Sequence, residues 1–480
     1  MMQSINPALT EISREKLTNT HLTTLQDWTK ALRDDAFRAS VHEDVIKNLY
    51  AVLSRLSVEI QSLNDVVDPQ EESLSLLLKL TTECFRAQRN ACVQCTPIQC
   101  TLRDQGSIKL SFEILCKLIK LSSGGSNNVY DAIRCGIQFL GNIAVGNQLC
   151  KDDIWKLGFP HIFWNLLDLP DEKVVSYTCM VLHTCLDEHK TEQLAQDAQQ
   201  LKVSRKIMDL CRSLPDVDWT VLIATQHFLK SSQLIIKMYT EMTNEERLTL
   251  LELMLAHLDV GEEEKDSLIP LSLAEFLASC FTDHCKAVLS LTSESSADDQ
   301  AAMVVSRLLD ILCEMTSDQK KFMALQDRSD LLSSTVDLLK EVHILGKTSK
   351  NVFTAAHDFS LTRTEGAGTN TNPYLSFKSH LIRLIGNLCH GHSLNQDKVR
   401  ELDGIALILD NCSIDSNNPF ISQWAVFAIR NILENNPENQ KLIQGLRSQG
   451  VADDTILREM GFRVEERDGS LLLRPLKKDP

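Results

Sequence analysis

The 480-residue sequence has few aromatic residues, 5% in all, and no uninterrupted apolar run near the ~20 residues that a membrane-spanning helix needs. Its first residues, "MMQSINPALTEISREK", lack the basic start and apolar core of a secretory signal. We therefore expect an intracellular, soluble protein with no membrane insertion. The 18 glycines, 12 prolines and 43% hydrophobic residues are spread evenly, so no composition break separates several globular domains.

Basic residues are outnumbered: 49 Lys and Arg stand against 65 Asp and Glu, which gives a net charge of −16. Nucleic-acid backbones and anionic membranes do not attract an acidic surface, so neither is expected as a partner. The imbalance is concentrated in residues 241–300, with 14 acidic and 3 basic side chains. Two interpretations remain open: solvated loops that keep a large protein soluble, or a docking surface for a basic partner.

The motifs of enzymes are missing too. The chain has no phosphate-binding glycine loop, nucleophile elbow or zinc-protease helix, so we expect no enzyme and no cofactor. Most of the 15 cysteines lie in apolar helical stretches, where reduced thiols act as core residues. Cys92 and Cys95 could form half of a zinc site, but no clean second pair follows. The other groups that we weighed as metal ligands are His390, His392, Cys280, His284 and Cys285. We expect no metal site.

The chain does contain a repeated sequence motif. "LIRLIGNLCHGHSLNQDKVRELDGI" (381–405) returns in altered form as "AIRNILENNPENQKLI" (428–443), with Asn387 and Asn431 44 positions apart. Weaker copies surround Asn90 and Asn142. Periods of about 40–47 residues are typical of armadillo and HEAT arrays, whose units must stack to bury their apolar faces. We predict an all-α, armadillo/HEAT-like right-handed helical solenoid of at most about ten repeats.

Each repeat is predicted to hold a short first helix, a glycine turn, a second helix and a third helix that ends near the asparagine. Glycine suits that turn because it carries no Cβ penalty at positive φ. In the third helix after Pro419, we predict a buried stripe of Ile421, Trp424, Ile429 and Leu433. Asn418 is predicted to accept from unpaired amides where that helix begins. The signature residues of the repeat are Trp424, Ile429, Gln396, Gln440 and Gly404.

The domain organisation follows from where the helical periodicity fails. We predict an N-terminal armadillo-like array over 1–345 and a flexible insertion over 346–373, which is rich in Thr, Gly and Asn. A C-terminal armadillo block is predicted over 374–480. Near its end, Asp468-Gly469 predicts a small β-hairpin, since this dipeptide favours a two-residue turn.

The asparagines are the candidate protein-binding residues. In armadillo arrays the third helices line a groove, and an Asn amide can match both backbone groups of an extended peptide. Alternatively, each Asn bonds the following loop and fixes the helix end, and both interpretations stay open. A carrier of basic peptides is a further alternative. Import receptors place Trp four residues before the groove Asn, however, and here those positions hold Arg86, Gln138, Arg383 and Phe427. The groove candidates are Asn90, Asn142, Asn387 and Asn431.

The chain resembles a known family. "NNPFISQWAVFAIRNILENNPENQKLI" (417–443), with "SHLIRLIGNLCHGHSLNQDKVRELDGIALILDNCSID" (379–415) before it, looks like the C-terminal domain of the ataxin-10 family. "RNACVQC" and "QFLGNIAVGNQ" are similar to its N-terminal armadillo part. The resemblance implies a non-enzymatic adaptor that self-associates as a homo-oligomer.

The same resemblance implies roles in cytokinesis, neurite outgrowth and neuronal survival. It also implies binding of O-GlcNAc transferase and of a G-protein β subunit. The location that it implies is cytoplasmic and perinuclear, with pools near centrosomes, the midbody and the base of cilia. It offers no catalytic residues.

Overall fold

The computed structural model describes residues 2–64, 71–258, 269–291, 300–318, 321–348, 351–355, 374–412, 415–445, 462–467 and 470–475. The chain divides into two compact units, Met1–Phe276 and Leu277–Pro480, and the division falls within one helix, α17. We call them the first unit and the second unit and describe each by itself.

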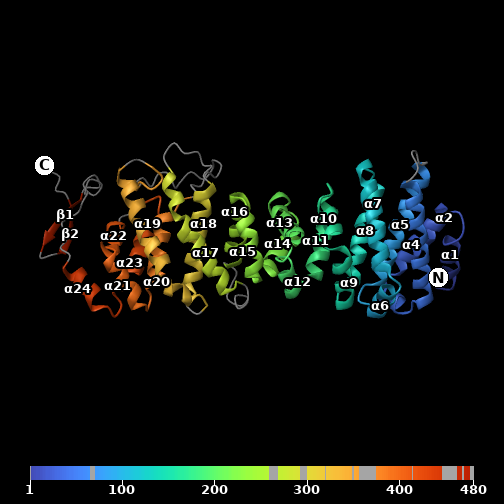
Figure 1. The fold of residues 1–480 in the computed structure, drawn as a ribbon, viewed down its shortest axis with the longest axis horizontal. Coiled ribbons are helices and arrows are strands. Elements are labelled where there is room, and N and C mark those ends of the chain that lie inside the picture. Colours follow the sequence, from blue (N-terminus) through green and yellow to red (C-terminus); the bar gives the residue numbers. More distant parts are fainter. Residues whose placement is uncertain are drawn as a thin grey trace. The chain divides into compact units, whose positions relative to one another are not determined.

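The first unit is built from helices alone in its described part. Three-helix repeats are evident, such as α6–α7–α8 and α9–α10–α11, and their third helices follow one another in the order α5, α8, α11, α14 (Figure 1). The helices are α1 (Met2–Ile12), α2 (Asn19–Ala31), α3 (Asp35–Ala39), α4 (Glu43–Asn64), α5 (Glu71–Ala91), α6 (Thr96–Asp104), α7 (Ser107–Leu121), α8 (Asn127–Ala144), α9 (Gln148–Gly158), α10 (His161–Leu167), α11 (Glu172–Cys185), α12 (Glu188–Gln193), α13 (Ala198–Ser213), α14 (Asp218–Gln226), α15 (Ser232–Glu241), α16 (Asn244–Leu258) and α17 (Leu271–His284).

Stacking of the third helices buries the apolar faces that the periodicity predicts. Phe85 of α5 and Phe139 of α8 are fully buried, and their rings stack 6.4 Å apart. Each such side chain contributes about 1.5–3 kcal/mol on leaving water. A single repeat could not bury both of its faces, so its stability depends on its neighbours.

The second unit continues the pattern with third helices α18, α20 and α23, each packed on the next. Its helices after α17 are α18 (Gln300–Ser317), α19 (Ser329–Thr348), α20 (Phe377–Cys389), α21 (Ser393–Glu401), α22 (Gly404–Asp410), α23 (Ile421–Leu433) and α24 (Pro437–Gly445), with 3-10 helices at Cys285–Ser290 and Met323–Asp327. The all-α helical repeat fold is therefore confirmed. No helix in the described ranges is both long and apolar enough to cross a bilayer.

Two antiparallel strands lie near the end of the chain. β1 (Phe462–Arg467) pairs with β2 (Ser470–Pro475), with Arg467 opposite Ser470. The strands flank Asp468-Gly469 as the sequence predicts, although these two residues lie outside the described part.

The predicted buried stripe of α23 is only partly right. Ile421 is buried, but Trp424, Ile429 and Leu433 are half-buried. The helix approaches α20 through its small residues, because a Cβ at Gly386 would lie 3.0 Å from the Cα of Ala428. The fully covered positions of α23 are Ile421, Ala425, Ala428, Asn431 and Ile432.

Gly404 serves a different purpose from the one predicted. It opens α22, but the left-handed residue of that turn is Asp403, with φ 58°. A Cβ at Gly404 would lie 2.7 Å from Cγ1 of Val399 and 3.1 Å from its carbonyl oxygen. Glycine is required there by the close approach of α21 and α22 rather than by positive φ.

The boundaries predicted around 346–373 lie within the second unit. Residues 346–348 continue α19, and Phe353, 2% exposed, packs 5.9 Å from Phe377. Residues 356–373 lie outside the described part. Because α19 packs against α20 and α21, the separation of 374–480 from the preceding helices stays a prediction.

Candidate functional site

The four predicted asparagines each tie a third helix to the one before it. Asn142 of α8 donates through Nδ2 to the carbonyl of Arg89 in α5, at 3.0 Å, and Asn431 of α23 donates to that of Gly386 in α20, at 2.9 Å. In both pairs the acceptor immediately precedes the asparagine of the neighbouring helix. The remaining two bonds run from Asn90 to the Thr29 carbonyl (3.0 Å) and from Asn387 to the Cys313 carbonyl (3.2 Å) and Thr316 Oγ1 (3.0 Å).

At three of these asparagines, a glutamine side chain donates a hydrogen bond to the backbone carbonyl of the asparagine. The backbone carbonyl of Asn142 accepts from Gln99 Nε2 at 3.1 Å, and that of Asn431 accepts from Gln396 Nε2 at 2.9 Å. The carbonyl of Asn387 accepts from Gln326 Nε2 at 3.0 Å. We call this two-way arrangement the asparagine–glutamine clasp. It supplies additional donors to carbonyls near a helix C-terminus, where the last four carbonyls lack a partner within the helix.

Gln99 and Gln396 each follow an asparagine, Asn90 and Asn387, by nine residues, but the bonded partners belong to neighbouring repeats. Gln99, nine residues after Asn90, serves the next asparagine, Asn142, and Gln396 likewise serves Asn431. Gln148, six residues after Asn142, instead bonds Asp152.

Gln326 was missed because its segment carries no Asn-Gln pair. It lies in the 3-10 helix Met323–Asp327. Its distance of 61 residues from Asn387 is also outside the repeat period. No signal in the sequence could have found it.

Burial decides what the asparagines can do. Asn90, Asn387 and Asn431 are 8%, 4% and 3% exposed, and Asn142 is half-buried. Their amide groups already donate to backbone within the fold, and a bond of this kind contributes about 1 kcal/mol, while orphaning a buried partner costs about 1–3 kcal/mol. The arrangement favours a structural role, with the preceding third helix rather than the following loop as partner. Binding of a peptide by these residues stays a prediction.

Beside the clasps, the second unit presents a polar and aromatic patch. Arg383 of α20 bonds Glu314 of α18 at 2.6 Å, and its guanidinium lies 4.8 Å from the ring centre of Trp424. The Trp424 ring meets Phe427 edge to face at 5.7 Å. We call Glu314, Arg383, Trp424 and Phe427 the third-helix surface. Arginine and half-buried aromatic residues are enriched at the centres of protein interfaces.

In the first unit, His183 and His227 lie 44 residues apart, the same spacing as Asn387 and Asn431. The rings of His183 (α11) and His227, which follows α14, lie 5.1 Å apart, and His183 Nε2 lies 2.9 Å from Gln226 Oε1. Burial lowers the pKa of His227 to about 4, the charges of His183 and Lys230 add to this, and a hydrogen bond with the His183 backbone opposes it. His227 is therefore neutral at pH 7.

This shift makes the first unit acid-sensitive. The unfolded chain, with an ordinary histidine pKa of 6.5, binds a proton that the fold excludes until about pH 4. The free energy of unfolding of the first unit is therefore highest above pH 6.5 and falls as the pH decreases from 6.5 towards 4. Because the ring is partly exposed, we reduce the expected effect to a loss of about 1 kcal/mol in the free energy of unfolding. Thermal unfolding at pH 7 and pH 5 should show a smaller drop in Tm for His227→Asn than for the parent chain. Equal drops would contradict the assignment.

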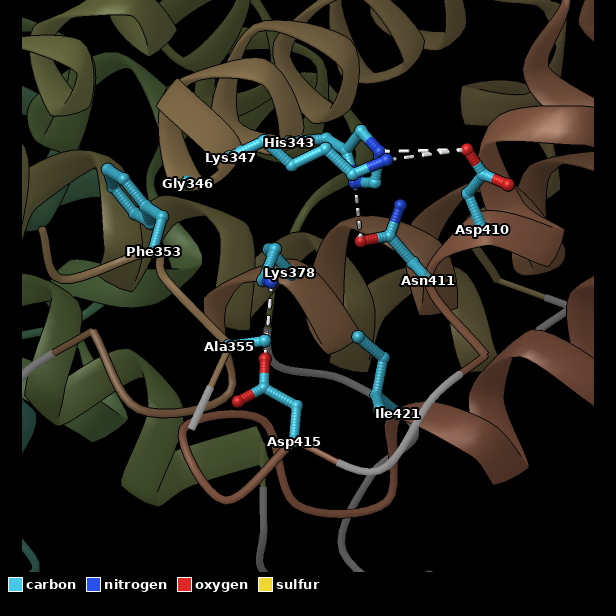
Figure 2. Close-up of a pocket in the computed structure, with 10 residues that line it drawn as sticks. All are labelled: His343, Gly346, Lys347, Phe353, Ala355, Lys378, Asp410, Asn411, Asp415 and Ile421. Carbon is cyan, nitrogen blue, oxygen red and sulfur yellow. Dashed lines mark hydrogen bonds and ion pairs between the residues drawn. The ribbon is translucent and has the colours of Figure 1, made fainter. Parts of the chain in front are cut away.

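A cavity of about 180 Å³ lies in the second unit (Figure 2). Lys378 at the start of α20 and Asp415 form a buried ion pair of 3.1 Å on its wall, with side chains 7% and 3% exposed. Opposite them, His343 Nδ1 lies 3.1 Å from Asn411 Oδ1, and burial lowers the pKa of this histidine. The lining residues are His343, Gly346, Lys347, Phe353, Ala355, Lys378, Asp410, Asn411, Asp415 and Ile421.

The charges on the cavity wall are used in pairs. Lys378 faces Asp415, and Lys347 lies 3.7 Å from Asp410, so no surplus charge is left to select an anion or a cation. Among the described residues that line the cavity, none is a Ser, Thr or Cys. The ion pair instead stabilises the start of α20, where Asn418 Oδ1 also accepts from the N–H groups of Lys378 and Ser379. Asn418 was predicted to cap its own third helix, and it caps the preceding one instead.

The zinc interpretation finds no support in the described ranges, where no three His, Cys, Asp or Glu side chains are placed to hold a metal ion. Cys92 is fully buried, and burial holds the pKa of its thiol well above the ordinary value. It is a neutral core thiol, as the apolar setting predicts.

Fold and contacts together define a helical repeat protein whose repeats are joined by side-chain bonds to backbone. The model of the spinocerebellar ataxia type 10 protein domain, whose name refers to homo-association, matches residues 377–474. Ataxin-10 of Xenopus tropicalis is 43% identical over 452 residues, 93% of this chain and 91% of that protein. Human ataxin-10 is 41% identical over 416 residues, 86% of each chain. An ataxin-10 homolog of Dictyostelium discoideum is 51% identical over 88 residues, 18% of this chain and 14% of that protein. The chain belongs to the ataxin-10 family.

Proposed function

We propose that this chain is a non-enzymatic scaffold that binds partner proteins and associates with itself. The observation that carries the proposal is the clasp. Because the asparagines are used inside the fold, the third helices α8, α20 and α23 are each joined to the preceding one, and the side chains of the third-helix surface stay available to partners. A repeat array suits this role because each unit contacts only its neighbours and leaves a long face open.

Family membership supports the finer proposals. They are roles in cytokinesis, neurite outgrowth and neuronal survival, and binding of O-GlcNAc transferase and a G-protein β subunit. The proposed location is cytoplasmic and perinuclear, with pools near centrosomes, the midbody and the base of cilia. Self-association is supported by the name of the domain model that matches residues 377–474.

The third-helix surface gives the test of partner binding. In Trp424→Ala the ring stacked on Arg383 is lost, and we expect recovery of crosslinked partner proteins by mass spectrometry to fall about tenfold. Trp164→Ala, at a half-buried tryptophan of the first unit, is the matched control. Equal recovery with both variants and the parent chain would refute a role for this surface.

The carrier of basic segments remains the alternative. Much of the predicted acidic surface, at 259–268 and 292–299, lies outside the described residues, so no contact described above favours it. Charge reversal at Glu262, Glu263 and Glu264 tests it: unchanged recovery of basic partners would dispose of the idea.

A further inference from the structure

Two aromatic rings of α23 meet almost at a right angle on the third-helix surface. The ring centres of Trp424 and Phe427 are 5.7 Å apart, and the ring planes are inclined at 85°. Both side chains are half-buried, so each is partly open to solvent. We call the space between the two ring planes the Trp424–Phe427 corner. Its walls are aromatic on both sides.

Helix α20 fixes both rings in place. The Arg383 guanidinium lies 4.8 Å from the ring centre of Trp424, and Glu314 holds this guanidinium through a bond of 2.6 Å. Phe427 lies against Gly386, where an added Cβ would come within 2.9 Å of the Cδ1 atom of the ring. Because the rings need not be ordered on binding, a ligand loses less of its binding free energy to entropy here than on mobile side chains.

The charges beside the corner leave no surplus of either sign. Asp310 of α18 bonds Arg307 Nη1 and His380 Nδ1, both at 2.7 Å, and Glu314 bonds Arg383. Lys378 of α20 pairs with Asp415. The other charged residues of α18, α20 and α23, with the residue that follows α23, are Arg307, Arg383 and Arg430 against Asp310, Glu314 and Glu434. Charge therefore selects neither an acidic nor a basic partner at this place.

A cation of a partner is also disfavoured at the rings themselves. Lys and Arg side chains bind aromatic faces, but Arg383 already does so at Trp424. A second cation at this ring would meet the guanidinium with like charge. What the corner offers to a partner is apolar surface, together with the indole N–H of Trp424, which can only donate.

A proline-rich segment has the chemistry that matches the corner. Its pyrrolidine rings are apolar and uncharged, and in the polyproline II conformation its carbonyls make no hydrogen bonds within the segment. Such segments dock in aromatic-lined grooves, and their preformed helix costs little entropy to order. An apolar corner beside one donor therefore suits one proline ring and one carbonyl.

We propose that the Trp424–Phe427 corner binds a proline-rich segment of a partner protein in the polyproline II conformation. One proline ring lies between the two aromatic rings, and the Trp424 indole N–H donates to a carbonyl of the segment. The inference rests on the partner binding proposed above for the third-helix surface, and it names the class of partner.

Fluorescence polarisation of a labelled oligoproline of about ten residues, titrated with the full chain, tests the proposal. Trp424→Ala removes one wall of the corner, and we expect the dissociation constant to rise at least about tenfold. Trp424→Phe keeps an aromatic wall and removes the donor, and we expect a rise of about threefold to fivefold. Trp164→Ala, in the first unit, is the matched control and should bind as the parent chain does.

Phe427→Leu tests the second wall. Leucine keeps an apolar side chain against Gly386 but removes the ring face, so we expect oligoproline binding to weaken about tenfold. Circular dichroism during heating accompanies each variant. Weaker binding by Trp424→Phe or Phe427→Leu at an unchanged Tm is a property of the corner and not of the fold.

Peptides of equal length made of Gly and Ser, of Glu or of Lys are the matched probes. We expect each to bind at least about tenfold more weakly than oligoproline. Tighter binding of the Glu or Lys peptide would overturn the proposal, and so would no oligoproline binding up to about 1 mM of the chain. Equal oligoproline binding by Trp424→Ala and the parent chain would remove the site from this corner.

The outcomes separate this inference from the proposed function. If oligoproline does not bind while Trp424→Ala still lowers the recovery of crosslinked partners, the third-helix surface stands and its partners are not proline-rich. If oligoproline binds the parent chain and the Trp424 and Phe427 variants alone weaken it, the assignment is supported.

Discussion

A chain that begins at Leu277 is expected to fold cooperatively, whereas a chain that begins at Tyr374 is expected to lose its cooperative unfolding transition. The longer fragment keeps the described contacts of α20 with α18 and α19. The shorter one removes the acceptors of Asn387 in α18 and the hydrogen bond between His380 Nδ1 and Asp310 Oδ1, at 2.7 Å.

The size of this effect depends on the apolar side chains that α20 buries within the second unit. Leu381, Ile385 and Leu388 of α20 are fully buried, and each contributes about 1.5–3 kcal/mol when removed from water. Their sum is comparable with the whole stability of an ordinary domain, about 5–15 kcal/mol.

Circular dichroism during heating of the two fragments gives the measurement. The packing of α20 on α18 and α19 predicts a cooperative transition for the longer fragment alone. A boundary before Tyr374, as the composition of 346–373 predicts, requires cooperative unfolding of both. A cooperative transition for the fragment 374–480 would therefore contradict the importance of the contacts made by α18 and α19.

The second large effect is expected at Asn387. Its side chain is 4% exposed and donates to two acceptors of α18, so Asn387→Ala removes two buried hydrogen bonds. We expect the free energy of unfolding of the second unit to fall by about 2–3 kcal/mol. Thermal unfolding checks the loss, and Gln440→Ala, at an exposed member of the same series, is the control with an expected change below about 0.5 kcal/mol.

Asn387→Ala also decides between the two interpretations of the asparagine series. If the residue bound a peptide, its loss would weaken binding and leave the unfolding transition in place. If the residue joins the helices, its loss lowers the Tm. An unchanged Tm for Asn387→Ala would refute the structural interpretation.

The sequence predicts the third helices, the asparagines and the β-hairpin because each depends on local chemistry. Apolar residues at helical spacing favour helices, Asn387 and Asn431 repeat at one period, and Asp468-Gly469 favours a tight turn. These features need no knowledge of which helix lies beside which.

The contacts of the same residues could not be predicted, because they join different repeats. Gln99 bonds a carbonyl 43 residues on, and Asn418 caps a helix that begins about 40 residues before it. A period in the sequence gives the distance between equivalent residues, but it does not say whether a side chain bonds its own repeat or the next. Trp424 was assigned to the core for a similar reason: its size favours burial, while the close approach of α20 to Ala428 leaves it beside Arg383.

The central claim is that the Asn387 and Gln326 side chains act together to hold the end of α20 to its neighbours. Native-state hydrogen exchange on the full chain tests it in a cycle of Asn387→Ala, Gln326→Ala and the double variant, read at the amides of α20. Each single change should lower the opening free energy by about 1–3 kcal/mol, and the double change by less than the sum, with a coupling of at least about 0.5 kcal/mol. Single variants that leave the protection of α20 unchanged would contradict the clasp.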